Sequence, residues 1–302
     1  MTEKKKIDVY AIVTEKIIEQ LEKGKIPWRI PWEYSQQQNL VSKHAYRGVN
    51  IILTSAAAMT NGWKSPYWLT FNQARKIGAK VKKGSKATLV TFWKILKFKD
   101  KDKNTGEDTV KVIPFLRYYN VFNVEQCELP ENWEKKIADL KADHEEISDC
   151  EEITKGYLNN EKLKMVHDDM NRAFYSPIDD FVNVPPLNSF KKREEYYSTV
   201  FHELAHSTGN PKRLKRFDYT EKINPFGSQD YSKEELVAEI TAAMLCGITE
   251  IEQKTIKNSA AYIQNWLNVL QDDRKFFVQA AGKAQKAADY ILGTTVEDSE
   301  EE

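Results

Sequence analysis

The sequence predicts an α+β protein of two domains: a small basic α+β domain, followed by a mostly helical domain with a small sheet. Its 302 residues are enough for two domains at roughly 100–200 residues each. Residues 1–126 carry 23 basic and 11 acidic side chains, a net charge of +12, whereas residues 127–302 carry 22 and 34, a net charge of −12. This asymmetry indicates that the two parts have different partners. We expect the domains to span residues 1–128 and 129–302.

The first domain is expected to begin with helices and to continue as a sheet. Apolar residues at helical spacing predict helices at residues 7–23, 48–59 and 70–77. Gly24 is a natural end for the first helix, and Thr70 is an expected N-cap for the third. Runs rich in Val, Thr, Phe and Tyr then predict an antiparallel sheet, with strands at residues 79–83, 87–98 and 110–123. The charged residues 99–108 are expected to form a loop between two of these strands.

The second domain is expected to be mainly helical. A charged segment at residues 131–148 predicts a helical connector that joins the domains or opens the second one. Three short strand-like runs follow within residues 161–184, and the last of them stops at Pro185 and Pro186. Helical periodicity dominates the rest and predicts helices at residues 191–208, 232–247, 257–271 and 273–292.

The composition excludes several classes of protein. No apolar run approaches the ~20 residues that a membrane-spanning helix needs, and no long apolar segment follows the basic N-terminus as in a secretory signal. The three cysteines, Cys127, Cys150 and Cys246, are far apart and form no Cys-x-x-Cys pair. We therefore expect a reduced, cytoplasmic protein with no membrane partner, no disulfide framework and no thiolate metal site.

The segment His202-Glu203-Leu204-Ala205-His206 has the HExxH pattern of zinc peptidases. Positions i and i+4 of a helix share one face, so both imidazoles can reach one zinc ion. Glu203 lies beside them, where its carboxylate can take a proton from a water held by the metal. The flanking residues contain no Pro or Gly, and their apolar side chains recur at helical spacing. The motif predicts one Zn²⁺ per chain, with Glu203 as the catalytic base.

A zinc peptidase needs a third protein ligand and a fourth position that is open to water. Position 212 is a lysine, where the longer HExxHxxGxxH pattern has its third histidine, and no histidine follows His206. The third ligand is therefore expected to be a carboxylate or one of the upstream histidines, His44, His144 and His167.

Glu235 and Glu239 are four residues apart in the next strongly helical segment, so both lie on one helix face. This spacing resembles that of the gluzincins, in which the first carboxylate binds zinc and the second orients a ligand histidine. We predict Glu235 as the third ligand and Glu239 as the residue that orients a histidine. Glu234 is the leading alternative ligand, and a solvated acidic helix face is the alternative to a site.

The first domain contains a long stretch without acidic residues. Residues 34–99 hold no Asp or Glu but 12 Lys and Arg, and five of the seven Trp lie between residues 28 and 93. Cations that follow a phosphate backbone, and aromatic faces on which bases stack, are what single-stranded nucleic acid requires. A basic solvated surface with its Trp residues in the core is the competing interpretation. The predicted nucleic-acid contacts are Arg47, Lys80, Lys82, Lys83, Lys86, Trp28, Trp32 and Trp68.

These motifs together resemble the ArdC family of antirestriction proteins, which is found on plasmids, phages and other mobile elements. The resemblance covers nearly the whole chain. It rests on GKIPWRIPW, YRGVNIILT, SPYWLTFNQA, AKVKKGSKA and YYNVFNVEQ in the first half, and on NRAFYSP, DDFVNVPP, YYSTVFHELAHSTGN, RLKR, YSKEELVAEITAAMLC and SAAYIQNWLNVL in the second. It implies a single-stranded DNA-binding domain, a zincin-like metallopeptidase domain and protection of incoming DNA from restriction.

The resemblance leaves three functions open. The chain is a DNA-binding peptidase that cuts a host or phage protein, a DNA-coating module whose zinc is structural, or a protease that acts on proteins bound to DNA. An intact Glu203 favours a catalytic site, because a structural zinc has no use for a base beside it. Single-stranded DNA and an unidentified protein substrate are therefore the expected partners.

Overall fold

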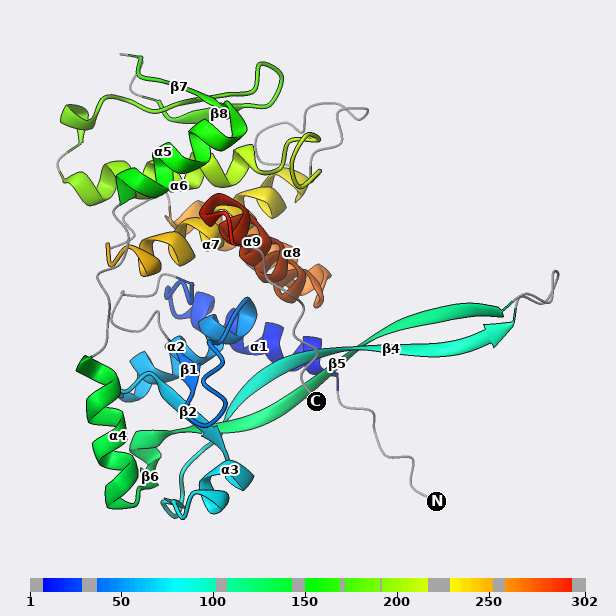
Figure 1. Cartoon of the computed structure of the whole chain (residues 1–302). Coiled ribbons are helices and arrows are strands. Elements are labelled where there is room, and N and C mark those ends of the chain that lie inside the picture. The colour runs from blue at the N-terminus through cyan, green and yellow to red at the C-terminus, as the bar shows by residue number, and fades with distance from the viewer. Residues whose placement is uncertain are drawn as a thin grey trace.

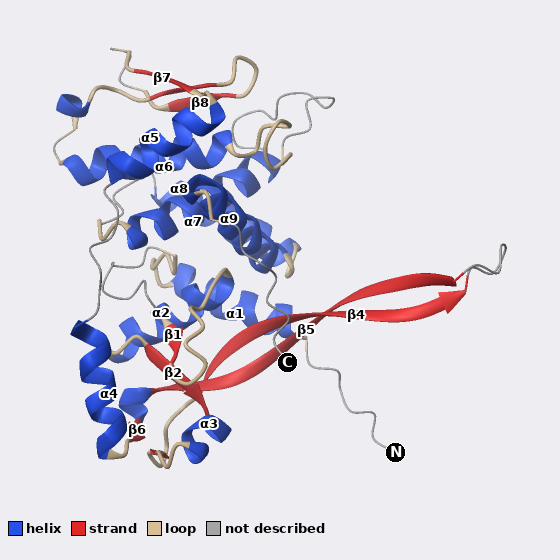
Figure 2. Cartoon of the chain, viewed as in Figure 1, coloured by secondary structure: helices blue, strands red, loops and turns tan. Residues whose placement is uncertain are grey.

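The computed structural model describes residues 8–28, 37–101, 108–142, 150–168, 172–190, 192–216, 229–251 and 259–294. The chain folds into two domains that lie one above the other in Figure 1. Figure 2 shows that the second domain is helical apart from one small sheet. The predicted α+β, two-domain fold is thereby confirmed. Among the residues described, no helix combines the length and apolar character needed to cross a bilayer.

The first domain is built on a four-stranded sheet with the strand order β1-β2-β5-β4. Its strands are β1 (Gln38–Asn39), β2 (Tyr67–Thr70), β4 (Thr88–Lys101) and β5 (Asp108–Asn123). β1 pairs in parallel with β2, and the other neighbours are antiparallel. β3 (Lys80–Val81) pairs instead with β6 (Cys127–Glu128), so the single predicted sheet is in fact two.

β4 and β5 form a long hairpin that projects from the body of the molecule (Figure 1). Backbone pairing continues as far as Lys101, which lies opposite Asp108. The predicted loop at residues 99–108 is therefore too long, because both of its ends belong to the strands. Residues 102–107 lie outside the described part of the chain.

Three helices pack beside this sheet, namely α1 (Val9–Glu22), α2 (Val49–Asn61) and α3 (Phe71–Lys76). The carboxylate of Asp8 accepts a hydrogen bond from the N–H of Ala11 and caps α1. Thr70 and Gln73 cap α3 reciprocally in a capping box, which confirms Thr70 as the N-cap. All three helices lie where the apolar spacing predicts them.

The second domain places α6 (Arg193–Ser207) between a three-stranded sheet and α7 (Gln229–Ile248). The sheet has the order β7-β9-β8, and its strands are β7 (Lys164–Val166), β8 (Phe174–Ser176) and β9 (Phe181–Asn183). These three short strands confirm the prediction for residues 161–184. α6 packs on β8 and β9 with one side and on α7 with another, so it occupies the centre of the domain.

One hydrophobic core runs through both domains. α1 contributes Leu21 to it and packs against α8 (Ser259–Asp272) and α9 (Phe276–Leu292) of the second domain. Trp28 lies edge-on against Trp266 of α8, with the ring centroids 4.9 Å apart. The domains therefore share packing and do not meet only through a linker.

Residues 131–142 of the predicted helical connector form one helix, and residues 143–149 lie outside the described part of the chain. α4 (Glu131–Ala142) packs on the first domain, where Trp133 and Ile137 join a core that includes Leu69. α5 (Cys150–Glu161), which the sequence analysis does not predict, packs against α6 and α9 in the second domain. α4, predicted as part of a connector that joins the domains or opens the second one, thus packs on the first domain, and the boundary at residue 128 stays a prediction.

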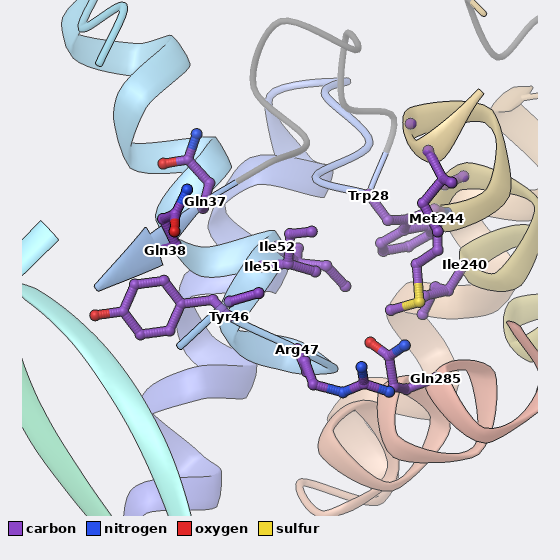
Figure 3. Close-up of a pocket in the computed structure, with 14 residues that line it drawn as sticks. Trp28, Gln37, Gln38, Tyr46, Arg47, Ile51, Ile52, Ile240, Met244 and Gln285 are labelled. Atoms are coloured by element: carbon purple, nitrogen blue, oxygen red, sulfur yellow. The ribbon is translucent and has the colours of Figure 1, made fainter. Parts of the chain in front are cut away.

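A cavity of about 370 Å³ lies between the domains (Figure 3). Its walls include Trp28 and Ile52 from the first domain, and Ile240 and Met244 of α7 from the second. None of the predicted metal ligands lines this cavity. The predicted metal ligands lie outside this cavity, where α6 and α7 face each other.

Candidate metal centre

The two histidines of the HExxH segment lie on one face of α6, as their i and i+4 spacing requires. Phe201 and Leu204 of the same helix are buried in the core, which fixes the rotation of the helix. The rings of His202 and His206 have centroids 4.7 Å apart and are nearly perpendicular. Their Nε2 atoms are 3.1 Å apart, so both nitrogens face the same point.

Glu235 of α7 completes this cluster. Its Oε2 atom lies 3.5 Å from Nε2 of His202, and its Oε1 atom lies 3.3 Å from Nε2 of His206. One ligand atom from each of the three side chains lies within 4.8 Å of the others. In the described part of the chain, no other group of His, Cys, Asp or Glu side chains has such an arrangement.

Two further carboxylates of α7 face the Nδ1 atoms of the same histidines. Oε1 of Glu239 lies 3.3 Å from Nδ1 of His202, and Oε1 of Glu234 lies 3.7 Å from Nδ1 of His206. A carboxylate at Nδ1 fixes the tautomer and ring orientation of a histidine that binds metal through Nε2. The geometry therefore favours Glu235 over Glu234 as a ligand, and it places Glu239 where an orienting residue belongs.

The donor set fits one small divalent cation. Two imidazole nitrogens and a carboxylate oxygen are ligands that zinc and related first-row metals take, with a further position open to water. Ligand atoms about 2.0–2.1 Å from a tetrahedral zinc ion lie about 3.3 Å from one another. The three separations in this cluster, between 3.1 and 3.5 Å, have that size.

The charges around the cluster favour a cation at its centre. Burial lowers the pKa of His202, but Glu235 and Glu239 outweigh burial and raise this pKa well above its usual value. Burial also opposes the shift at His206, where the charge of Glu235 and the contact with Glu234 raise the pKa to about 9. Burial would raise the pKa of Glu235, but the two imidazoles hold it far below its usual value. The field that holds protons on the imidazoles would equally attract a metal ion.

Glu203 lies on α6 between the two histidines and is buried. Burial raises the pKa of its carboxyl group, although the neighbouring imidazoles act in the opposite direction. The carboxylate also accepts a hydrogen bond from the backbone of Tyr175 in β8, which orients it. A raised pKa suits a group that must take up and then release a proton near neutral pH.

Metal binding is expected to depend on pH, because protons and the cation compete for the same Nε2 atoms. Since the pKa of His206 is raised to about 9, the apparent affinity for Mn²⁺ should rise as the pH approaches about 9 from below. The raised pKa stabilises the metal-free fold fully below about pH 6.5, and this contribution is lost as the pH rises through about 9. Titration calorimetry measures the rise in metal affinity with pH, and thermal melts of chelator-treated protein measure the loss of stability between about pH 6.5 and 9. A metal affinity that does not change with pH would contradict the prediction.

The two upstream histidines that the structure describes, His44 and His167, do not join the cluster. Nδ1 of His167 lies 2.8 Å from the backbone oxygen of Val184, and its ring packs near Tyr196. His44 belongs to the first domain, beside β1. His144 lies outside the described residues. Among the alternatives for a third ligand, the structure thus brings the carboxylate of Glu235 to the histidines.

The lysines predicted to contact nucleic acid lie on the surface of the first domain. The exposed members of this set are Lys80, Lys82, Lys83 and Lys86. Lys82 donates a hydrogen bond through Nζ to the backbone oxygen of Glu125 at 2.9 Å. Gly84 has a φ of +87°, in the left-handed region that favours glycine, and this conformation forms the turn between the lysines. We refer to these four residues as the lysine turn.

The other predicted nucleic-acid contacts differ from expectation. Trp28 and Trp68 are fully buried, so neither presents a ring face to a base, and their assignment as stacking residues is wrong. Trp68 instead donates its indole N–H to Oε1 of Gln37 inside the domain. Arg47 binds the carboxylate of Asp289 in α9 and so joins the two domains. Trp32 lies outside the described residues.

The structure exposes aromatic rings that the sequence analysis does not single out. Tyr119 of β5 is 46% exposed, and its ring lies 6.2 Å from that of Phe92 in β4. Arg117 pairs directly opposite Phe92, so all three side chains share one face of the sheet. We call them the aromatic patch. In the sequence, only the alternation of residues along β5 indicates that Arg117 and Tyr119 lie on the same face of the sheet. That alternation does not show which face the rest of the domain buries.

Two families match the two domains. Residues 7–122 match the family described as the N-terminal domain of anti-restriction factor ArdC, and residues 153–283 match the family described as zincin-like metallopeptidase. Two proteins of Escherichia coli named DNA primase TraC are each 33% identical to this chain, over 93% and 94% of its length. The chain spans only 26% and 20% of those two proteins. Uncharacterized protein y4eC of Sinorhizobium fredii (strain NBRC 101917 / NGR234) is 30% identical over 94% of this chain and 91% of its own.

Crystal structures of the antirestriction ArdC protein from the R388 plasmid match almost the whole chain. The metal-free structure has a TM-score of 0.73 and 35% identity, over 94% of this chain and 97% of that one. The Mn(II)-bound structure has a TM-score of 0.75 and 32% identity, over 95% and 98%. Together with the cluster of His202, His206 and Glu235, the Mn(II)-bound structure indicates a divalent-metal site. With both domains matched in order and along nearly its full length, the chain belongs to the ArdC family of antirestriction proteins.

Proposed function

We propose that this chain is a zinc-dependent peptidase whose first domain binds single-stranded DNA, and that it protects incoming DNA of a mobile element in the cytoplasm. The observation that carries the proposal is the convergence of His202, His206 and Glu235 on one point, with the buried carboxyl group of Glu203 beside them. A structural zinc site uses four protein ligands. Three ligands and a neighbouring base are instead the arrangement of a hydrolytic site.

The residues of the site have separate roles in this proposal. A zinc ion held by His202, His206 and Glu235 would polarise the peptide carbonyl and lower the pKa of water. Glu203 takes the proton of the attacking water and passes it to the leaving amine. Glu239 holds the Nδ1 proton of His202, so that Nε2 of this ring stays free as a donor atom.

Peptide hydrolysis tests the proposed activity directly. The zinc-loaded protein should release peptides from fluorescently labelled casein, and a chelator should stop the reaction until zinc is added back. The assay should be run with and without single-stranded DNA, since a protein bound to DNA is one of the candidate substrates. Casein and a DNA-bound protein both left intact by fully zinc-loaded protein would contradict a peptidase.

Single-stranded DNA binding is proposed for the first domain because of its charge. Residues 1–126 have a net charge of +12, and residues 34–99 contain no acidic side chain. The lysine turn places four ammonium groups on the surface, where they can neutralise phosphates without reading sequence. The aromatic patch offers the exposed ring face that the buried Trp28 and Trp68 do not.

Replacing both Lys82 and Lys83 by Ala is expected to weaken binding of all single-stranded sequences alike. Each lost phosphate contact should also flatten the salt dependence of log Kd, by about 0.7 per contact for a single strand. Fluorescence anisotropy at several salt concentrations measures both effects. The double variant with Lys162 and Lys164 replaced by Ala is a matched control, because both of these lysines are exposed in the second domain. Equal losses in the two double variants would contradict the proposed surface.

The same assay distinguishes stacking from charge. Tyr119→Ala removes an exposed ring and no charge, so it should weaken binding while leaving the salt slope unchanged. Stacking of one base contributes about 1–3 kcal/mol by alanine substitution. Unchanged affinity in Tyr119→Ala would leave the lysine turn as the proposed surface and remove the aromatic patch from it.

DNA coating is the second candidate function, and the charge of the first domain favours it. A protein that binds phosphates without regard to sequence can shield DNA from restriction enzymes with different target sites. In this case the zinc site serves another purpose, or none, in antirestriction. The two candidates predict different results for a Glu203 variant in cells.

A further inference from the structure

Arg216 makes a set of contacts that joins α6 to α7 beside the candidate metal centre. Its guanidinium binds both oxygens of Glu234, with Nε 3.1 Å from Oε2 and Nη2 2.7 Å from Oε1. Nη1 donates to the hydroxyl oxygen of Thr208 at 2.7 Å, and Nη2 also donates to the backbone oxygen of Ala205 at 2.8 Å. The side chain of Arg216 is only 7% exposed, so these contacts form away from bulk water.

The residues that Arg216 contacts are the immediate neighbours of metal-site residues. Ala205 directly precedes His206 in α6, and Glu234 directly precedes Glu235 in α7. One planar group thus fixes the distance between the two helices at the level where His206 and Glu235 meet. Planar, two-pronged binding of a carboxylate is specific to arginine, because lysine presents only a point charge.

Arg216 also determines what Glu234 can do. The carboxylate of Glu234 lies 3.7 Å from Nδ1 of His206, on the side of the ring that faces away from Nε2. A buried carboxylate without a cation would be costly, and it would be drawn toward a nearby metal ion. Bound by Arg216 through both oxygens, Glu234 stays at Nδ1 and leaves the ligand position to Glu235.

We propose that Arg216 is a positioning residue of the metal centre, which holds Glu234 against Nδ1 of His206 and thereby fixes the orientation of that ring toward the metal. Nδ1 of His202 faces Glu239, and Nδ1 of His206 faces Glu234, whose carboxylate is bound by Arg216. This inference rests on the metal centre proposed above and assigns a role to a residue outside the HExxH segment.

Arg216→Lys is the test, because it keeps the charge and removes the two-pronged contact. Arg213→Lys is a matched control from the same segment: Arg213 is also buried and ion-paired, with Nη1 2.8 Å from Asp180 and Nε 3.0 Å from Glu161. Nη1 of Arg213 also donates to the backbone oxygen of Ser207 at 2.9 Å, so both arginines bind the end of α6. Arg213 differs from Arg216 in that neither of its carboxylate partners is one of the three that face the imidazole nitrogens. Both variants should lower the melting temperature measured in chelator, but only Arg216→Lys should change metal binding.

The expected result is a loss of about tenfold in affinity for Zn²⁺ or Mn²⁺ in Arg216→Lys, at the lower end of the range for residues that orient a ligand. Substituting Co²⁺ should give an altered visible spectrum in this variant and an unaltered one in Arg213→Lys. The double variant Arg216→Lys with Glu234→Gln should lose no more affinity than the worse single variant, because both changes act through one contact.

Wild-type affinity and an unchanged Co²⁺ spectrum in folded Arg216→Lys would overturn the inference, and so would equal losses of affinity in Arg213→Lys. Glu235→Ala serves as the reference for the centre itself. Metal retained in Glu235→Ala would refute the proposed centre, whereas metal lost in Glu235→Ala and kept in Arg216→Lys would refute only the role of Arg216.

Discussion

Replacing Glu203 by Gln is expected to abolish peptidase activity while metal content, fold and DNA binding remain those of the wild type. Gln has nearly the same shape as Glu but cannot take a proton from water, and a general base contributes about 10²–10⁴-fold to the rate. Glu203 is not one of the three side chains whose ligand atoms converge, so the site should still hold a metal ion. Casein hydrolysis and elemental analysis of the same preparation measure the two effects.

In cells, the same variant distinguishes protection by proteolysis of a protein from protection by coating of the DNA. Protection against restriction is expected to survive Glu203→Gln at least in part, because the basic first domain can bind DNA without the peptidase. Transformation or conjugation into a restricting host should be compared for the wild type, Glu203→Gln and the Lys82/Lys83 double variant. Complete loss of protection in Glu203→Gln with normal DNA binding would contradict coating. Full protection by the lysine variant, once its DNA binding is shown to be gone, would contradict it equally.

Glu235→Ala is expected to lose metal far more completely than Glu234→Ala. Both oxygens of Glu235 face the Nε2 atoms, whereas both oxygens of Glu234 are bound by Arg216. Glu239→Ala should have an intermediate effect of about 10–100-fold on metal affinity, since Glu239 contacts Nδ1 of His202. Isothermal titration with Zn²⁺ ranks the three variants.

His202→Ala provides the reference for an empty site in this series. It removes one of the three donor groups and should also lower the melting temperature that is measured with metal present, because binding to the folded state stabilises it. Equal retention of metal in Glu235→Ala, Glu234→Ala and Glu239→Ala would show that the third ligand lies outside α7.

Much of the metal centre can be predicted from the sequence because it depends on local spacing. The i and i+4 positions of His202 and His206 share a face in any helix, and the same holds for Glu235 and Glu239. Helical periodicity around both pairs predicts the helices that carry them. What spacing cannot give is the contact between α6 and α7, which decides that Glu235 meets Nε2 and that Glu234 meets Nδ1.

The errors in the first domain have the same physical origin. Trp28 is buried by residues more than 200 positions away, Trp266 and Phe277, and no local pattern indicates such a partner. Arg47 belongs to the acid-free stretch by sequence, yet its carboxylate partner Asp289 comes from α9. Composition therefore predicts the charge of the first domain, but tertiary packing decides which of its cations and rings are exposed.

The elements that the sequence analysis missed are short or highly polar. β2 consists of four residues, too few for a period of two to be recognised, and it is buried against its neighbours. α5 has few apolar residues, although Ile153 and Tyr157 at positions i and i+4 are both buried. Arg216 is part of the RLKR segment that supports the family resemblance, but its role carries no signal in the sequence, because its partners Glu234 and Thr208 are fixed only by the fold.

The most direct test of the central claim is a crystal structure of the zinc-loaded protein with anomalous diffraction measured at the zinc edge. We predict one strong peak per chain, about 2.0–2.2 Å from Nε2 of His202, Nε2 of His206 and a carboxylate oxygen of Glu235. Glu203 should lie beside the peak and outside the ligand set. A peak bound by Glu234 in place of Glu235, or a peak coordinated by four protein side chains with no position open to water, would contradict a catalytic centre of the kind proposed for this chain.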